Sequence, residues 1–581
     1  MARWLDERLG PGDLLGCWLD APAGSPSWAR AFSVALGFCL AVAAITGVAL
    51  GALYAPAGAS AWASVFFVEF QFPGGWLVRS LHIAAAEGSL VFGALALLLW
   101  VFEGRYRHRR DLSFWSLALV LFLVAAFCIT GNPLRWDNRG YFGLVTEVNV
   151  MSEVPGVGRL LRALLLGGVL PNNWTLPRLY TLHALVLSTL ALALTALGLR
   201  ASRRAGPVGG VTPYGDGQLA YDLLACTATF LALLVAAFLR RAPLEAPADP
   251  LASYNARPEW YFQWLYVLRN TVPPSLQSIL ATGTPVLLGC VLFVLPLLDR
   301  DPQAPIRQRV VFLVPVVLGF LGIGILTVVG LVSDRNNPEL QKARAAQARV
   351  DRRALQIARH EGVAPAGALT MMREDPLLKG EDLFRQHCAS CHRLGELGPV
   401  DGKLAGPTLD GWGSEAWVME ILDDPDAPHL FGNTPYQGKM PSYTRPPKDP
   451  KDAANFTPMP LEQRQAIARF LAGEARGEAP GHHPDGEKLV RQRCTTCHLF
   501  RGDTDDAEGL APELAGWASL GWTRAQIGNP GTNLTYRPVA LSPGLEGHMP
   551  RFDTQLSPAD LDLLTRYVLH QAGKPRAGHP R

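Results

Sequence analysis

The sequence predicts an all-α protein made of seven membrane-spanning helices followed by two small helical domains. Two observations lead to this prediction. Long apolar runs are confined to the first 335 of the 581 residues, and the rest of the chain contains an internal repeat. A chain of this length is too long for one compact domain. The net charge of +3 is close to zero, so nucleic acid is not an expected partner.

Seven apolar segments approach or exceed the roughly 20 residues that a helix needs to cross a bilayer. They lie at residues 32–54, 76–102, 113–131, 178–199, 218–239, 281–298 and 310–332. The first follows about thirty residues of mixed polarity that lack the pattern of a secretory signal, so it is predicted to be a membrane span. The sixth has the weakest apolar pattern.

Arginines cluster in the loops that follow the second, fourth and sixth predicted spans. Short cytoplasmic loops carry an excess of positive residues, so these three loops and the N-terminus are predicted to be cytoplasmic. Because the number of spans is odd, the chain after Asp334 is expected on the opposite side. The predicted location is the inner membrane of a bacterium, with the C-terminal domains in the periplasm.

Two of the predicted spans each carry one histidine, His82 and His183. Ionisable residues inside a membrane are rare and usually functional. Either histidine alone would more often be a packed residue bonded to a neighbouring helix, but a matched pair favours one iron site with two imidazole ligands. Arg79 and Arg178 precede the two histidines, and we expect their guanidinium groups to bind haem propionates.

The C-terminal region contains two CxxCH sequences, the attachment signal for c-type haem. The expected covalent and axial positions are Cys388, Cys391 and His392 in the first, and Cys494, Cys497 and His498 in the second. A zinc site or a redox disulfide would need only the CxxC, whereas a histidine follows at once in both copies. The sequence therefore predicts two covalently bound haems c.

A Met-Pro pair follows each CxxCH sequence by about fifty residues, at Met440 and Met549. A thioether ligand raises the potential of haem iron, which suits haems that pass electrons outward. Taken in chain order, Met440 completes the haem at Cys388 and Met549 completes the haem at Cys494.

The motifs belong to an internal repeat, in which CASCH, AGPTLDGW and MP recur as CTTCH, LAPELAGW and MP. Pro407 and Pro512 lie in it where a backbone carbonyl can accept a hydrogen bond from the ligating imidazole. The charged segment 336–375 is predicted to be a solvated helix or linker. The expected divisions of the chain are 1–205, 206–335, 336–375, 376–476 and 477–581.

The membrane part resembles cytochrome b of the quinol-oxidising cytochrome bc complexes. The motifs GGWLVRSLH, GNPLRWDNRGYFG, LPRLYTLH and PEWY carry the resemblance, in chain order. It implies that residues 1–205 and 206–335 are the N-terminal and C-terminal parts of cytochrome b, and that 376–476 and 477–581 are cytochrome c domains. One haem b with two histidine ligands and two haems c with histidine and methionine ligands are expected.

The PEWY motif consists of Pro258, Glu259, Trp260 and Tyr261, between the fifth and sixth predicted spans. The resemblance implies that this motif forms the quinol site. A carboxylate at the membrane edge can move between substrate and water, so Glu259 is expected to accept a proton from quinol.

Other subunits are expected as well. The chain contains no Rieske-type pair of cysteine–histidine loops, so a separate Rieske iron–sulfur protein is expected. A soluble or membrane-bound cytochrome, or a terminal oxidase, is the expected electron acceptor. The resemblance also implies a dimeric, multi-subunit complex.

The chain departs from the family where a second haem b would bind. Family glycines that let the backbone pass close to the retained haem match Gly47 and Gly131. The four positions expected to serve the second haem hold Ala96, Leu197, Ser33 and Leu117. Four coherent changes predict that the second haem b is absent.

Two alternative functions remain open from the sequence. The chain could be a membrane-tethered dihaem electron-transfer cytochrome whose b part is mainly an anchor. An anchor, however, gives no reason to retain both histidines, both arginines and an intact PEWY motif. The reaction could also run in reverse, as quinone reduction, since its direction depends on potentials that the sequence does not give.

Overall fold

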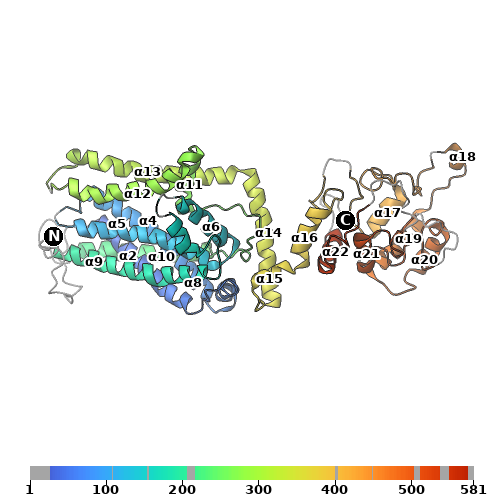
Figure 1. Ribbon diagram of the computed structural model, residues 1–581, viewed down its shortest axis with the longest axis horizontal. Helices are drawn as coiled ribbons and strands as arrows, with labels where there is room; N and C mark the ends of the chain where they lie inside the picture. The colour runs from blue at the N-terminus through green and yellow to red at the C-terminus, as the bar shows by residue number, and fades with distance from the viewer. Residues whose placement is uncertain are drawn as a thin grey trace. The chain divides into compact units, whose positions relative to one another are not determined.

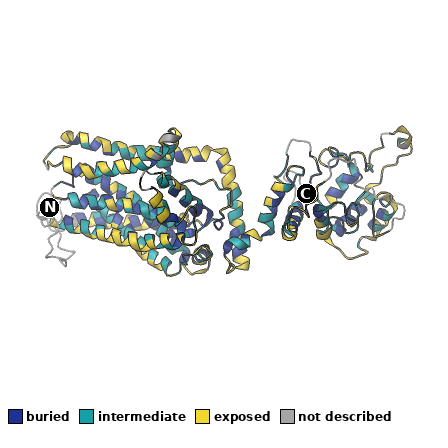
Figure 2. Ribbon diagram, viewed as in Figure 1, coloured by how far each residue is buried: buried dark blue, intermediate teal, exposed yellow. Residues whose placement is uncertain are grey.

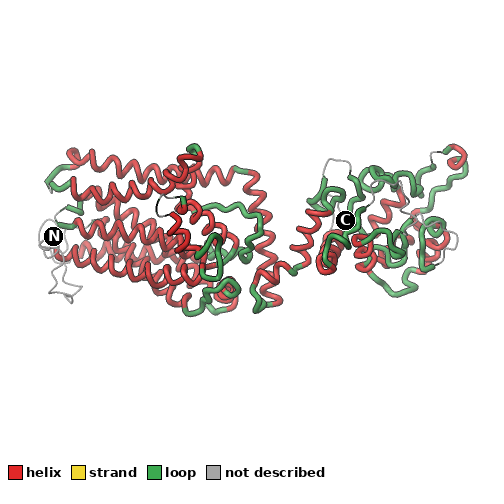
Figure 3. The backbone as a smooth tube through the Cα atoms, viewed as in Figure 1, coloured by secondary structure: helices red, strands yellow, loops and turns green. Residues whose placement is uncertain are grey.

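The computed structural model divides the chain into two compact units, Met1–Thr370 and Met371–Arg581. It describes residues 27–107, 109–153, 156, 158–205, 216–301, 303–399, 404–447, 449–502, 511–536 and 549–573. In these residues helices are joined by loops without a β-strand, and β-type pairing is limited to two isolated bridges (Figure 3). The predicted all-α class is confirmed.

Seven helices among the described residues are long and apolar enough to cross a membrane, as the sequence predicts. Most extend past the predicted apolar segment, because polar residues at the ends continue the helix. Their bounds are Trp28–Gly51 (α2), Gly75–Glu103 (α4), Asp111–Gly131 (α5) with the 3₁₀ turn Asn132–Arg135 (η2), Thr175–Thr181 (α8) continued by the π-helix Leu182–Leu187 (η3) and Ser188–Arg204 (α9), Asp216–Leu239 (α10), Pro274–Leu298 (α12) and Ile306–Asn336 (α13).

Small side chains let the helices of this bundle approach one another closely. Helix α4 packs against α2, α5 and α10 (Figure 1). It buries Ala85, Ser89, Gly93 and Ala96. A Cβ atom on Gly93 would lie 3.0 Å from the side chain of Leu121 in α5. Membrane helices associate through such close packing, because lipid offers no hydrophobic drive between them.

Short helices lie between the spans. They are Ala61–Phe66 (α3), Phe67–Gln71 (η1), Asn138–Ser152 (α6), Gly158–Leu166 (α7), Trp260–Phe262 (η4) and Gln263–Asn270 (α11). Helix α11 packs against α13, where Gly330 leaves room: a Cβ there would lie 2.4 Å from the Gln263 side chain. This contact fixes the chain directly after the PEWY motif.

The loop that leads from α10 to the PEWY motif is fixed by hydrogen bonds to its backbone. Asp137, which is fully buried, caps α6 through the backbone N–H of Gly140 and also accepts from the N–H of Glu245 at 3.2 Å. The indole of Trp62 donates to the carbonyl of Glu245 at 2.8 Å. The backbone N–H of Asn138 donates to the carbonyl of Ala246 at 3.0 Å.

Helix α14, Pro338–Glu361, runs across the end of the bundle (Figure 1). It buries Leu340, Ala354, Ile357 and Ala358. The carboxylate of Asp351 accepts from the backbone N–H of Ala246 at 2.8 Å. The sequence therefore predicts this helix, but α14 is not solvated on all sides, because one of its faces packs on the rest of the first unit.

The second unit is built from short helices that carry many buried residues (Figure 2). These residues form two cores. The helices are Pro376–His387 (α16), Glu415–Asp423 (α17), Pro450–Ala453 (α18), Leu461–Arg476 (α19), Pro484–Arg493 (α20), Leu520–Gly528 (α21) and Pro558–Ala572 (α22), and Ala368–Arg373 (α15) lies where the two units meet in the chain. Each core takes residues from both sequence repeats.

Candidate functional site

The two membrane histidines face one another inside the bundle. His82 lies on α4 and His183 lies on the π-helical segment η3, and their ring centroids are 6.3 Å apart. A π-helical segment inside a longer helix is rare and often marks a functional site. The structure therefore brings together the pair that the sequence predicts as iron ligands.

Each histidine is oriented through Nδ1 by a threonine of a neighbouring helix. Thr46 on α2 lies 3.1 Å from Nδ1 of His82, and Thr130 on α5 lies 3.1 Å from Nδ1 of His183. Nδ1 of His82 also lies 3.0 Å from the carbonyl of Ala43, which can only accept a hydrogen bond. Nδ1 therefore carries the proton and Nε2 is left to bind a metal, the usual arrangement of a ligating histidine.

The glycine after each threonine leaves space beside the ring. A Cβ atom on Gly47 would lie 3.1 Å from Cε1 of His82, and one on Gly131 would lie 2.8 Å from Cε1 of His183. The two positions form a cradle that a side chain would fill, so the residues present fit a haem between the histidines. The glycines were expected from the family resemblance; the threonines were not.

One cavity of about 2300 Å³ encloses both histidines and reaches the PEWY segment. Glu259, Tyr261, Asn132, Arg135 and Arg139 line the same space. The cavity therefore joins the expected haem site to the expected quinol site.

The arginines do not lie as the sequence analysis expects. Arg79 lines the cavity, but its guanidinium donates to the carboxylate of Glu69 at 2.8 Å and to the carbonyl of Ala242 at 2.9 Å. Arg178 is exposed and donates to the carbonyl of Ala163 at 3.0 Å, outside the described cavity lining. Binding of a propionate by Arg178 is therefore not supported by its position.

Arg135 is a better-placed cation that the sequence analysis missed. It is buried, lines the cavity, and its Nε and Nη2 atoms have no hydrogen-bond partner among the described residues. Asp137 and Glu259 lie nearby, at 3.5 Å and 3.9 Å from these nitrogens. A buried guanidinium with unused donors fits an anionic group such as a propionate.

The PEWY residues form one wall of the cavity. The carboxylate of Glu259 accepts a hydrogen bond from Arg139 at 2.6 Å, and the hydroxyl of Tyr261 accepts from the amide of Asn132 at 3.2 Å. The indole N–H of Trp260 is buried and has no hydrogen-bond partner in the part of the chain that the structure describes, and Pro258 leads the chain into the turn of η4. Polar groups thus converge at the end of an otherwise apolar space, as in many ligand sites.

A second carboxyl group lies near the same site and was not identified from the sequence. Burial, followed by the nearby charge of Glu259, raises the pKa of Glu147 on α6 to about 8. Glu147 is half-buried and sits on a helix between two spans. A carboxyl that titrates near neutral pH beside Glu259 can influence proton release from this site.

The cavity continues past the histidines to the opposite end of the bundle. There it is lined by hydroxyl side chains, including Ser33, Ser89, Ser113, Ser116 and Thr195. His82 and His183 are the histidines among its described lining residues. Ala96 is fully buried, and Ser33 accepts a hydrogen bond from the indole of Trp100 at 3.1 Å, so this end offers no described imidazole ligand.

In the second unit, the histidine of each CxxCH sequence meets the predicted proline carbonyl. Nδ1 of His392 donates to Pro407 at 2.8 Å, and Nδ1 of His498 donates to Pro512 at 2.9 Å. These hydrogen bonds confirm the expectation for both prolines. Burial lowers the pKa of both imidazoles, which keeps the rings neutral with Nε2 available for iron.

The methionines do not follow the chain-order expectation. Met440 packs against the core that contains Cys494, and Met549 packs against the core that contains Cys388. The structure thus groups each Met-Pro pair with the CxxCH sequence of the other repeat. Chain order predicts which methionine lies beside which CxxCH sequence only when each repeat forms its own core. Here each core contains residues of both repeats.

Comparison with known families covers most of the chain. Residues 25–206 match the family model Cytochrome b/b6/petB, and residues 247–346 match Cytochrome b(C-terminal)/b6/petD. Residues 377–473 match Cytochrome c, and residues 482–568 match Cytochrome C oxidase, cbb3-type, subunit III. The chain is a cytochrome b followed by cytochrome c domains. Such a multi-pass cytochrome carries haem b and haem c and transfers electrons in the membrane.

A solved structure described as "Hyperthermophilic respiratory Complex III" is also similar to this cytochrome. It aligns with 59% of this chain and 93% of its own, at 22% sequence identity and a TM-score of 0.46.

Proposed function

We propose that this cytochrome oxidises quinol beside Glu259 and divides the two electrons between haem b and haem c. The observation that carries the proposal is the shared cavity: Glu259 and Tyr261 line the same space as His82 and His183. A quinol bound at the PEWY wall would be adjacent to the haem b site without an intervening barrier of protein.

The two protons and two electrons of quinol need separate destinations. Quinol loses both protons and both electrons to become quinone. Glu259 accepts one proton at the cavity wall, and the other proton is released to water. Arg139 holds the carboxylate in place before the transfer, and releases it when the charge is neutralised. Haem b supplies a one-electron acceptor when it is bound between His82 and His183.

The second electron leaves by way of a separate Rieske iron–sulfur protein and the haems c. The axial histidines of these haems are His392 and His498, and a soluble or membrane-bound cytochrome or terminal oxidase is the final acceptor. The arginine-rich loops favour an N-terminus in the cytoplasm of a bacterium and haem c domains in the periplasm. A dimeric, multi-subunit complex would supply the Rieske protein.

Replacing the proposed proton acceptor tests this function. In membranes that contain the assembled complex, Glu259→Gln should slow quinol-dependent reduction of haem c by about 100-fold, because an amide cannot take up the proton. The haem b and haem c absorbance of the variant should equal that of the parent.

A matched control is Glu153→Gln, at the exposed end of α6 outside the described cavity lining. It should leave the rate unchanged. Equal rates for Glu259→Gln and the parent would refute quinol oxidation at this wall and favour a tethered electron-transfer cytochrome.

A further inference from the structure

The second unit, which carries both CxxCH sequences and is called the haem c unit below, is built by an exchange of helices between its two repeats. Helices α16 and α19 begin and end the first repeat, and α20 and α22 begin and end the second. In the structure α16 packs against α22, and α19 packs against α20. The first helix of each repeat therefore meets the last helix of the other.

The two helix crossings, α16 with α22 and α19 with α20, have the same kind of contact. A Cβ atom on Gly380 of α16 would lie 2.2 Å from Cβ of Tyr567 on α22. A Cβ on Gly486 of α20 would lie 2.6 Å from Cβ of Phe470 on α19. In each case a glycine of one repeat receives an aromatic residue of the other, so the two crossings are equivalent.

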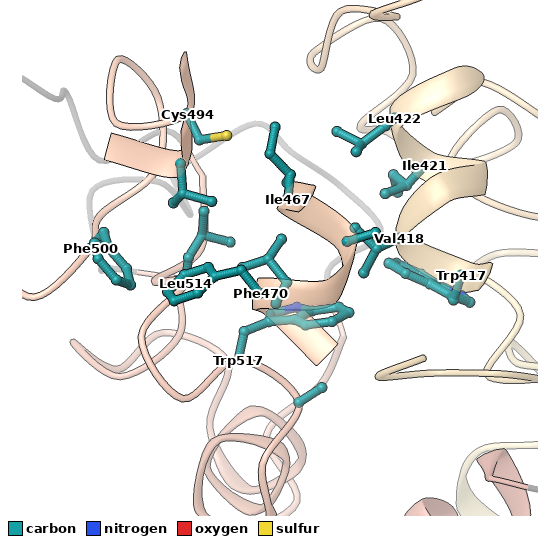
Figure 4. Close-up of a cluster of buried hydrophobic side chains, with 14 of the residues drawn as sticks. Trp417, Val418, Ile421, Leu422, Ile467, Phe470, Cys494, Phe500, Leu514 and Trp517 are labelled. Atoms are coloured by element: carbon teal, nitrogen blue, oxygen red, sulfur yellow. The ribbon is translucent and has the colours of Figure 1, made fainter. Parts of the chain in front are cut away.

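The buried cores confirm the exchange. We call the core that contains Cys494 the Cys494 lobe and the core that contains Cys388 the Cys388 lobe. Figure 4 shows the Cys494 lobe, in which residues of the first repeat pack with residues of the second. From the first repeat come Trp417, Val418, Ile421, Leu422, Ile467 and Phe470, and from the second come Cys494, Phe500, Leu514 and Trp517.

The chain passes between the lobes at two matching turns. Gly411 and Gly413 have φ angles of 79° and 80°, and Gly516 and Ala518 have φ angles of 65° and 58°. Such left-handed backbone suits glycine, and Ala518 adopts it despite its side chain.

Two tryptophans, one from each of these turns, pack together. Trp412 and Trp517 lie in the middle of the two turns, with ring centroids 4.8 Å apart. Trp412 packs against both lobes. The backbone N–H of Gly411 donates to Ala572 at 3.1 Å, which ties the first turn to the last helix of the second repeat.

The Met-Pro segments follow the exchanged halves. Met440 packs on the Cys494 lobe, and the hydroxyl of Tyr443, three residues later, donates to the carbonyl of Arg493 at 3.3 Å, directly before Cys494. Met549 packs on the Cys388 lobe, and Phe552, three residues later, lies with its ring 5.8 Å from that of His387. Each methionine is thus beside the haem attachment sequence of the other repeat.

We propose that the axial methionines are exchanged between the repeats. Met440 is the sixth ligand of the haem held by Cys494, Cys497 and His498. Met549 is the sixth ligand of the haem held by Cys388, Cys391 and His392. The proposal rests on histidine–methionine ligation at both haems c, and it means that neither repeat completes a haem site alone.

A full-length variant with one haem c tests the exchange. Cys388→Ala combined with Cys391→Ala removes the first attachment site and leaves the haem at Cys494. In this background Met440→His should abolish the methionine-to-iron charge-transfer band and lower the midpoint potential, because a thioether ligand is lost. Met549→His should change neither. The reverse result, with Met549→His alone altering the remaining haem, overturns the proposal.

The haem count separates this proposal from the one on which it rests. Pyridine haemochrome analysis of the parent chain should give two haems c, and a lower count would refute haem attachment rather than ligand exchange. If two haems are present but the charge-transfer band is absent from the parent, histidine–methionine ligation itself is wrong and the exchange of ligands is overturned with it.

A packing test does not depend on removing a haem. Gly380→Tyr should lower the melting temperature of the haem c unit, because the new ring collides with Tyr567. Adding Tyr567→Gly should restore much of the loss, whereas adding Phe470→Gly should restore none. Recovery with Phe470→Gly, or with neither, would show that α16 does not pack on the last helix of the other repeat, and would overturn the exchange.

Discussion

At the scale of single residues, the expected haem b site contains two copies of the same dipeptide. Thr46–Gly47 on α2 faces His82, and Thr130–Gly131 on α5 faces His183. The threonine orients the imidazole and the glycine keeps its edge clear. The repeated Thr-Gly pair is visible in the sequence, but the role of the threonine becomes evident only when the helices are packed.

Adding a methyl group at these glycines should reduce haem b binding in a graded way. Gly131→Ala should lower haem b content several-fold, since its Cβ would lie 2.8 Å from His183 and the ring must shift. Gly47→Ala should have a smaller effect, because its contact with His82 is 3.1 Å. Gly37→Ala, on the same helix as Gly47 and with nothing within 4 Å, is the control. The measurement is the ratio of haem b to haem c, and equal ratios in all three variants would contradict the cradle.

Glu147 should make the stability of the membrane unit depend on pH. Burial raises the pKa of its carboxyl from 4.5 to about 8, so the folded state keeps a proton that the unfolded state releases between these values. The stabilisation is complete below the lower value and is lost as the pH rises through the higher one. Glu147→Gln should flatten this dependence. Thermal loss of haem b absorbance between about pH 6 and about pH 9 measures it, and parallel curves for the variant and the parent would contradict the prediction.

At the scale of secondary-structure elements, α14 has a structural role that its charged sequence does not indicate. Its sequence is rich in arginine and glutamine, which predicts a solvated helix. The buried residues recur at helical spacing, however, and Asp351 supplies an acceptor for the backbone of the loop before the PEWY motif.

Removing that acceptor should loosen the loop. Asp351→Ala leaves the backbone N–H of Ala246 without its partner, which should cost about 1–3 kcal/mol. Amide exchange of a peptide covering residues 240–249 should accelerate. Arg349→Ala, at an exposed position of the same helix, should leave exchange unchanged. Unaltered exchange in Asp351→Ala would mean that the other hydrogen bonds of the loop suffice to hold it.

The helices and the candidate haem-binding histidines and cysteines could be predicted from the sequence, because each prediction depends on local information. Apolar length identifies the spans, and CxxCH identifies the haem c sites. The positions of the two arginine side chains, Arg79 and Arg178, could not be predicted in the same way. Arg79 lies three residues before its histidine, which is nearly the same helical face, but Arg178 lies five residues before His183 and about 140° away around a helix. That offset is consistent with the exposed position of Arg178. The hydrogen bond from Arg79 to Glu69, in contrast, depends on tertiary packing.

At the scale of the whole molecule, the exchange of helices could not be predicted from the repeat. Gly380 and Gly486 occupy equivalent positions, as do Tyr567 and Phe470, so either pairing of helices satisfies the same pattern. The choice depends on the turns at Trp412 and Trp517, whose direction the sequence does not specify. The sequence repeats therefore predict two haem attachment sites, while each lobe is formed by parts of both repeats.

The whole chain should bind one haem b for every two haems c. The cavity extends through the bundle, but the end remote from the PEWY motif holds hydroxyl side chains, and Ala96 and Leu197 stand where the family has histidines. Without an imidazole pair among the described residues there, haem iron lacks a pair of histidine ligands at that end. Pyridine haemochrome spectra of the purified chain should give a ratio of one haem b to two haems c, and His183→Ala should remove the haem b signal alone. A ratio of one to one would show that a second haem b binds in the serine-lined end, and the electron from quinol would then have a path across the whole membrane.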